Sequence, residues 1–421
     1  MSVLAQRSNC IDSRIRSRKS TLKLGMHLKN NKKKIVGSIL SVSALVILFQ
    51  NCSGGFSPVS MSSLGSTSGS TSSASDPATP VPQGKVDVFV AAGHMGRTVM
   101  SCDDGKTWIN DMSANDAARC WRDPKEAAYV ECDHTPYSGT GLDAGDGAIY
   151  VQNGWGFNGT VRKSTNGKDW TVIRQNGWGG GVVYAKNSVL SIFEYNWGLS
   201  TDSGTTFSPG TVDGYDHGFV QRAGNTFIIV GRAGGSKTQG FSPDQGKTWI
   251  NPTVQPGWMG TFAEGNGMLI SLGTLVVQGG KNIGYAARST DGGATWKATQ
   301  VFEAEGQVWD ARVVFDGSQF VSWSNGMTFK SSDAVTWTQT KTVDANGNRP
   351  WWSAAVSVNP KTKAFVAINN SWGSWYDTQW AYESKDGILW TALDRAHFSG
   401  GHPISRITTV ELDASVCPAT K

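Results

Sequence analysis

The sequence contains little charge for its length. Asp, Glu, Lys and Arg make up 17% of the 421 residues, whereas soluble domains usually have about a quarter. Glycine is abundant, with 51 residues, and tryptophan is unusually frequent, with 18. A disordered chain rarely combines low charge with so many aromatic residues. The composition therefore favours an all-β protein with many tight turns over a helical or disordered chain.

A basic surface is missing from the main body of the chain. The formal net charge is +5, but lysine and arginine are concentrated before residue 35. Without that segment the protein is close to neutral or mildly acidic. We therefore predict no nucleic-acid partner, because binding to the phosphate backbone depends on clustered positive charge.

The apolar run near the N-terminus is short for a membrane span. Residues 29–34 are basic, and residues 35–49 are apolar over about fifteen positions, which fits a signal peptide. The run ends just before Cys52, which small residues follow, and this ending resembles a bacterial lipobox. The resemblance implies that Cys52 is diacylated and anchors the mature protein in the outer membrane, at the cell surface or facing the periplasm. Cleavage by ordinary signal peptidase and an uncleaved anchor are the alternatives.

The composition divides the chain into three parts. Residues 1–51 are an N-terminal extension and signal peptide. Residues 52–84 are rich in Ser, Gly, Thr and Pro, so we expect a flexible tether. Residues 85–421 carry the strand signals and form the folded domain.

One motif recurs seven times in the folded domain. Its pattern is Ser-x-Asp-x-Gly-x-Thr-Trp, and the copies begin at Ser101, Ser164, Ser200, Ser242, Ser289, Ser331 and Ser384. The Asp carboxylate can accept N–H bonds within its own turn, and Gly takes positive φ at little cost. Each copy therefore predicts a compact hairpin in which the Asp is structural and the Trp packs.

The repeat predicts an all-β fold, a seven-bladed β-propeller with four-stranded antiparallel blades. Two further strand signals precede each copy, as in residues 311–315 and 319–323. Residues 404–412 form a strand that no copy follows, and residues 85–90 already look like a second strand. We therefore expect the C-terminal strand to close the ring in blade one.

The motif resembles the BNR or Asp-box repeat. This group includes sialidases, xyloglucan-specific glucanases, sortilin-type receptors and photosystem II assembly factors. The resemblance covers roughly residues 85–412 and implies the propeller fold. It does not select one function, because unrelated activities share the repeat.

We expect a ligand face at the end of the propeller opposite the Asp boxes. Trp and His side chains on such a face suit a hydroxyl-rich ligand, because sugar C–H faces stack on indole rings. The alternative is that the Trp side chains fill the space between blades. At the starts of inner strands we place Trp178, Trp258, Trp309, Trp351, Trp352, His134, His217 and His402. In loops between second and third strands we place Trp155, Trp197, Trp323, Trp372 and Trp375.

Two functions remain open from the sequence. The first is a monomeric binding lipoprotein that recognises a glycan or an envelope protein and needs no cofactor or metal. The second is a glycoside hydrolase, for which Asp216 and Asp310 are the carboxylate pair to test. A sialidase is disfavoured because the Arg-Ile-Pro signature is absent, although Arg97, Arg232 and Arg312 lie near the predicted ligand face.

Four cysteines follow Cys52. Export favours disulfides, and four cysteines allow three pairings. We favour Cys120 with Cys132 across the long loop between blades one and two. Cys102 with Cys417 would then tie the C-terminal tail to blade one. Free buried thiols are the alternative.

Overall fold

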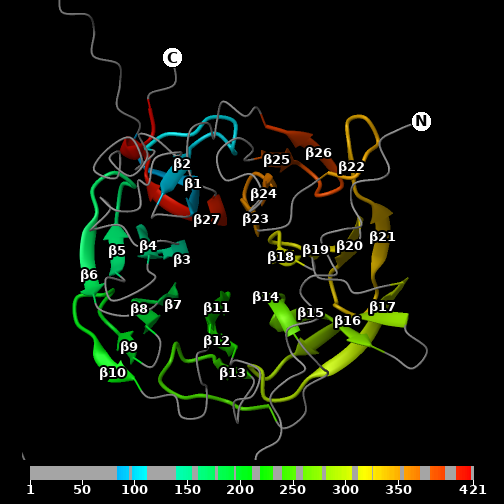
Figure 1. The fold of residues 1–421 in the computed structure, drawn as a ribbon, viewed down its shortest axis with the longest axis horizontal. Helices are drawn as coiled ribbons and strands as arrows, with labels where there is room; N and C mark the ends of the chain where they lie inside the picture. Colours follow the sequence, from blue (N-terminus) through cyan, green and yellow to red (C-terminus); the bar gives the residue numbers. More distant parts are fainter. Residues whose placement is uncertain are drawn as a thin grey trace, which may run out of the picture. The chain divides into compact units, whose positions relative to one another are not determined.

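The protein is a seven-bladed all-β propeller (Figure 1). The computed structural model describes residues 83–93, 97–110, 139–153, 160–175, 179–193, 196–210, 219–230, 239–252, 259–276, 281–305, 312–324, 326–350, 355–369, 380–393 and 404–418. These residues form seven sheets, and the inner strand of each sheet contacts those of both neighbouring sheets. No helix among them is long and apolar enough to cross a membrane.

The strands of each blade are given from the axis outwards. Blade one has β27 (Ile404–Asp413), β1 (Lys85–Gly93) and β2 (Thr98–Ser101); blade two has β3 (Gly139–Gly145), β4 (Ala148–Asn153), β5 (Thr160–Ser164) and β6 (Thr171–Gln175); blade three has β7 (Gly179–Ala185), β8 (Ser188–Phe193), β9 (Asn196–Ser200) and β10 (Ser208–Gly210). Blade four has β11 (Phe219–Ala223), β12 (Thr226–Val230) and β13 (Gln239–Ser242); blade five has β14 (Met259–Gly265), β15 (Met268–Val276), β16 (Lys281–Ser289) and β17 (Lys297–Glu305). Blade six has β18 (Arg312–Phe315), β19 (Phe320–Ser324), β20 (Met327–Ser331) and β21 (Thr338–Lys341); blade seven has β23 (Ala355–Val358), β24 (Phe365–Asn369), β25 (Trp380–Ser384) and β26 (Leu389–Ala392).

The outer edges of the blades vary. In blades one and four the fourth strand is reduced to a single bridge, Met100 with Ile109 and Phe241 with Ile250. Blade seven gains a fifth strand, β22 (Val343–Asp344), which pairs parallel to β26. The variation lies at the rim, so the inner strands around the axis keep one arrangement in all seven blades.

The C-terminal strand closes the ring, as the sequence predicts. β27 pairs antiparallel with β1, so that Lys85 lies opposite Asp413 and Gly93 opposite Ile404. Figure 1 shows the two strands side by side in blade one, near the C-terminal end of the chain. This pairing covers an edge of β1 that would otherwise be exposed.

A small ion cluster joins blade seven to the closing strands. The Lys361 ammonium lies 2.5 Å from a Glu411 oxygen in β27 and 3.2 Å from an Asp87 oxygen in β1. The hydrogen bond to Glu411, followed by that to Asp87, raises the pKa of Lys361. Because the lysine is exposed, we assign most of the closure energy to strand pairing and only a small part to this cluster.

Each interface between neighbouring blades has its own hydrophobic core, and each core takes in one Asp-box aromatic residue. Those residues are Trp108, Trp170, Phe207, Trp249, Trp296, Trp337 and Trp390. Trp390 is fully buried against Trp323 and Phe365. The repeated motif therefore both turns the chain and fills the space between blades.

The box in blade five shows the local hydrogen bonding. The Ser289 hydroxyl donates to Asp291 Oδ1 at 2.7 Å and accepts from the Gly293 amide at 2.8 Å. Asp291 Oδ1 also accepts from the Thr295 amide at 2.9 Å. The Trp296 indole donates to the Gly293 carbonyl at 2.9 Å. The turn thus satisfies its own polar groups. In blades two, six and seven the box is one residue shorter, and the Ser hydroxyl accepts from the amide three residues further along the chain.

The glycine of the box serves both conformation and packing. Gly105 has φ +90°, and a Cβ there would lie 2.8 Å from Val366 Cγ2 of blade seven. In blade six, Ala334 takes this place with φ 57° and is fully buried. Alanine can therefore occupy the positive-φ position where the adjoining core has room for a methyl group.

The described residues include one disulfide, Cys102–Cys417, which joins positions 315 residues apart. Cys102 lies in the box of blade one, and Cys417 follows the short 3-10 helix η5 (Ala414–Val416). This confirms the predicted tie between the C-terminal tail and blade one. Cys52, Cys120 and Cys132 lie outside the described residues.

Candidate functional site: the central channel

The seven inner strands enclose a cavity of about 550 Å³ on the propeller axis. Each of β27, β3, β7, β11, β14, β18 and β23 contributes side chains to its wall. The volume lies in the range of ordinary small-ligand sites. We call this cavity the central channel.

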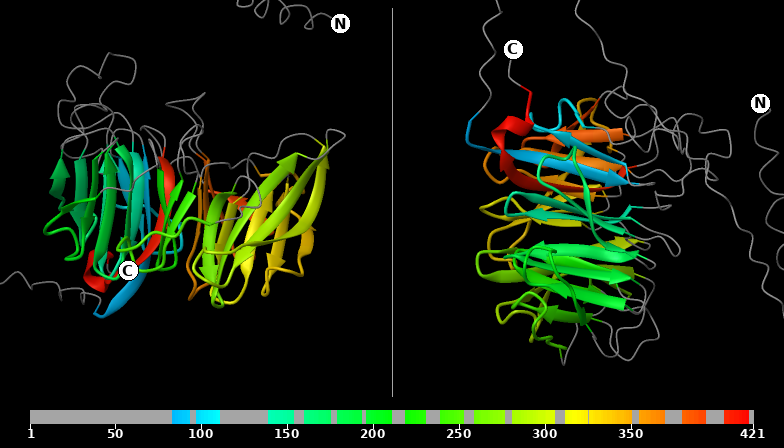
Figure 2. Two further views of the ribbon diagram at one scale, coloured as in Figure 1. Left: turned by 90° about the horizontal axis from the view of Figure 1, so that it is seen from below. Right: turned by 90° about the vertical axis from the view of Figure 1, so that its left-hand side faces the viewer.

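Strand direction distinguishes the two ends of the channel. In blade one, β27 begins beside the end of β1, whereas the box starts at Ser101 near the opposite end of the sheet. The same order holds in the other blades, and Figure 2 shows them edge-on. We call the end near the Asp boxes the box end, and the end where the inner strands begin the distal end.

An ion pair crosses the channel wall from blade two to blade four. Asp143 of β3 accepts two hydrogen bonds of 2.6 Å from Arg222 of β11. The buried carboxylate also accepts from the amides of Tyr184 and Ala144, each at 2.9 Å. Burial by itself would lower the pKa of Arg222, but the charge and hydrogen bonds of Asp143 raise it. Asp143 is thus fully engaged in joining three blades.

The distal end of the channel is lined by an exposed aromatic ring and two arginine side chains. Phe219, the first residue of β11, is 59% exposed and lines the channel. Arg312 begins β18, and Arg406 is the third residue of β27; both also line the channel. Arg406 is open to the cavity, and its Nη1 donates to the Ser405 carbonyl at 3.4 Å. The surrounding protein lowers the pKa of Arg406 by desolvation.

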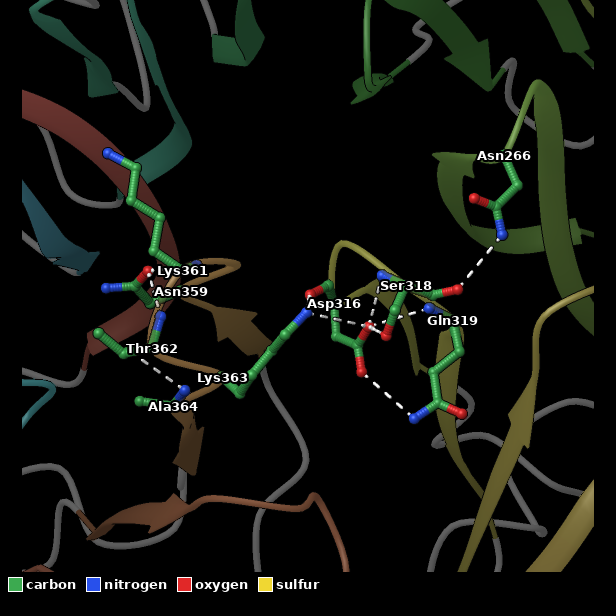
Figure 3. Close-up of polar contacts among 9 residues, drawn as sticks. All are labelled: Asn266, Asp316, Ser318, Gln319, Asn359, Lys361, Thr362, Lys363 and Ala364. Carbon is green, nitrogen blue, oxygen red and sulfur yellow. Dashed lines mark hydrogen bonds and ion pairs between the residues drawn. The ribbon is translucent and has the colours of Figure 1, made fainter.

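A second polar network braces blades five to seven on their turns (Figure 3). Asp316 accepts from the amides of Ser318 and Gln319 at 2.8 and 2.9 Å, and the Lys363 ammonium lies 3.7 Å from the same oxygen. Asn266 donates to the Ser318 carbonyl at 3.3 Å. Burial would raise the pKa of Asp316, but the hydrogen bonds and Lys363 lower it. These groups satisfy one another, so we interpret the network as structural.

The Asp-box carboxylates are also structural. Hydrogen bonds from Thr295 lower the pKa of Asp291 to about 2. Those from Ser200 and Thr206 lower the pKa of Asp202 to about 2 as well. A carboxylate that is ionised at neutral pH and already accepts several hydrogen bonds is a poor proton donor.

Most predicted site residues lie outside the described parts of the chain. These are Trp178, Trp258, Trp309, Trp351, Trp352, His134, His217, His402, Asp216 and Asp310, with Trp155, Trp372, Trp375 and Arg232. Their roles stay predictions. Within the described ranges, no group of three or more His, Cys, Asp or Glu side chains could hold a metal ion.

For two other residues, which the sequence analysis placed in loops at the ligand face, the predicted position is wrong. Trp197 lies in β9 and is buried in the core between blades three and four. Trp323 lies in β19, where its indole donates to the Gly387 carbonyl of the next blade at 2.6 Å. Arg97 lies in the connection between β1 and β2 near the distal end, as predicted, but it is buried. Both indoles fill space between blades, so packing explains them.

The sequence missed Asp143, Arg222, Phe219 and Arg406. Asp143 and Arg222 are 79 residues apart, so no local pattern connects them. Arg312 was correctly placed near the distal end, because the blade-six strand signals locate its position. A useful signal would have been charged residues within inner strands, where an apolar wall is otherwise expected.

No family model and no curated protein matches the sequence. Solved structures that resemble the fold include the GH74 xyloglucanase from Xanthomonas campestris, with 13% identity and a TM-score of 0.47 over 77% of this chain and 52% of that chain. YCF48 bound to D1 peptide has 15% identity and a TM-score of 0.42, over 63% and 84% of the two chains. The chain spans about half the length of the xyloglucanase. Both TM-scores lie below 0.5, so the seven-bladed fold rests on the strand pairing of this chain, and neither similarity indicates a function.

Proposed function

We propose that this protein is a cell-envelope lipoprotein whose propeller binds an oligosaccharide in the distal half of the central channel. The supporting observation is the cavity of about 550 Å³, whose wall includes an exposed aromatic ring, Phe219. Sugar rings stack on aromatic faces, while polar groups in the wall fix their orientation. A channel of this composition suits a hydroxyl-rich ligand.

The lipoprotein part of the proposal rests on the sequence. Cys52 follows the signal-like segment, and residues 52–84 have the composition of a flexible tether. Such a tether would hold the channel away from the membrane surface and leave it free to meet polymers of the envelope.

The wall chemistry favours binding over hydrolysis. A glycosidase needs two carboxyl groups about 5–10 Å apart on either side of the bond. In the described lining, the carboxylate is Asp143, which Arg222 and two backbone amides already hold. We therefore propose binding as the function, with hydrolysis as an outcome of the test.

A glycan array with neutral and acidic oligosaccharides tests this proposal on the full-length protein in mild detergent. Ala355→Trp would fill the channel from β23, whereas Val172→Trp on the exposed strand β6 is a matched control. We expect binding to be lost in the first variant and kept in the second, with both variants folded. Equal binding by both, or binding of none of the oligosaccharides, contradicts the proposal; release of shorter sugars would establish the hydrolase instead.

A further inference from the structure

A second cavity, of about 370 Å³, lies between blades two and three at the box end. Its described lining comes from the hairpin 163–173 of blade two and from residues 203–205 of the box of blade three. We call this cavity the inter-box groove. It shares no described lining residue with the central channel, so a ligand here is separate from one in the channel.

The box of blade two differs from the other six in the position of its carboxylate. Those boxes have Asp at the third position, whereas blade two has Asn166 there and carries a carboxylate three residues later, at Asp169. Asn166 Oδ1 accepts from the amides of Lys168 and Asp169 at 2.9 and 2.8 Å, and its Nδ2 donates to Asp169 Oδ2 at 2.8 Å. The turn therefore needs no internal carboxylate, and the negative charge lies on an exposed side chain that lines the groove.

The positive charge of the groove is held in place by both blades. The Lys163 ammonium donates to the Ser203 carbonyl at 3.0 Å and lies 5.6 Å from the centroid of the Tyr150 ring. The Tyr150 hydroxyl donates to the same carbonyl at 3.3 Å. An ammonium has three protons, so two remain for a ligand. Among the described residues no carboxylate forms an ion pair with Lys163 and no cation forms one with Asp169.

The groove thus offers one positive and one negative charge that do not neutralise each other. Ile173, which packs against the core between blades two and three, adds an apolar patch. The described lining contains no aromatic ring, so a neutral sugar would find no face on which to stack. A ligand that carries both a carboxylate and an ammonium can form a charge-assisted hydrogen bond with each group.

We propose that the inter-box groove binds a short peptide with free ends, its carboxylate at Lys163 and its ammonium at Asp169. The cavity volume lies in the range of small-ligand sites. Because Lys163 and Asp169 do not pair with each other, the two charges of the ligand must also lie apart, as they do in a peptide and not in a single amino acid. Small side chains between the two ends can contact Ile173. Binding here does not depend on the proposed function.

The test is isothermal titration calorimetry of the full-length protein in mild detergent with trialanine, N-acetyl-trialanine and trialanine amide. Acetylation removes the ammonium and amidation removes the carboxylate, while the rest of the peptide is kept. We expect trialanine to bind and each derivative to bind about fivefold more weakly, as for charge pairs that solvent partly screens. Free alanine should bind more weakly than trialanine, because its two charges share one carbon atom.

Variants locate the two charges. Asp169→Asn should weaken binding of trialanine about fivefold and leave that of N-acetyl-trialanine unchanged, because the derivative already lacks the pair. Lys163→Gln should have the same pair of effects on trialanine and its amide. Lys168→Gln removes an exposed charge from the same hairpin, outside the described lining, and should leave binding unchanged. Thr165→Trp should fill the groove from an exposed position and abolish binding in a folded protein.

Each of four results would overturn the inference. If both derivatives bind as tightly as trialanine, the groove does not recognise the ends of the peptide. If Thr165→Trp leaves binding unchanged, the peptide binds elsewhere. If free alanine binds as tightly as trialanine, the ligand is an amino acid. If trialanine does not bind while an oligosaccharide still binds in the channel, the groove is a gap between blades and the proposed function stands.

Discussion

The disulfide Cys102–Cys417 allows a quantitative prediction about ring closure. Because it joins residues 315 apart, the chain-entropy relation gives about 6 kcal/mol of stabilisation through the unfolded state. Residual structure in the unfolded chain lowers this figure, so we expect a loss of about 2–5 kcal/mol when the bond is removed. Both cysteines are only partly buried where they contact the core between blades one and two. Their side-chain packing therefore contributes little to the free energy of unfolding.

The assay is guanidinium unfolding of Ser75–Lys421, the compact unit that contains the propeller, followed by tryptophan fluorescence. Cys102→Ala, Cys417→Ala and the double variant should lose the same free energy, because either change breaks the one bond. A loss below about 1 kcal/mol would refute the closure argument. Losses that add in the double variant would show that the two side chains act as separate packing groups.

Further predictions concern the box, the closing strand and the anchor. Asp291→Ala should lower the free energy of unfolding by about 1 kcal/mol, since the exposed carboxylate accepts turn hydrogen bonds. The pKa of Asp291 in the folded protein is about 2, below the ordinary value. The stabilisation from its carboxylate should therefore be present above about pH 4 and lost as the pH falls towards 2. An Asp291→Ala variant with unchanged stability at pH 7 would contradict the structural role. Deleting residues 404–412 should prevent cooperative folding, and a sharp unfolding transition in the deleted protein would count against ring closure by β27. Cys52→Ser should release the protein from membranes, and mass spectrometry should find a diacylated Cys52 in the parent; unchanged processing of the variant would argue against lipidation.

The features predicted correctly from the sequence are those whose physics is local or repeated. The Asp box satisfies its polar groups within eight residues, so its seven copies specify seven hairpins without knowledge of the rest of the chain. The closing strand was predicted because β1 lacked an inner partner in sequence while residues 404–412 lacked a box. The pairing of Cys102 with Cys417 was the one that remained after Cys120 was assigned to Cys132, and it agrees with that closure.

The features that were missed depend on which way a strand side chain faces. Trp323 looked like a ligand-face residue, but its register in β19 directs the indole to Gly387 of the next blade. Arg222 meets Asp143 across 79 residues of sequence, through three blades that only the closed ring brings together. The number of blades can therefore be predicted from the sequence alone, whereas predicting which side chains meet in the channel requires the geometry of the closed ring.

A crystal structure of the full-length protein with an oligosaccharide bound tests the central claim most directly. We predict electron density for the ligand in the distal half of the channel, with a sugar ring over Phe219. Density at the box end, between outer strands, or in the channel but away from Phe219 would contradict the account.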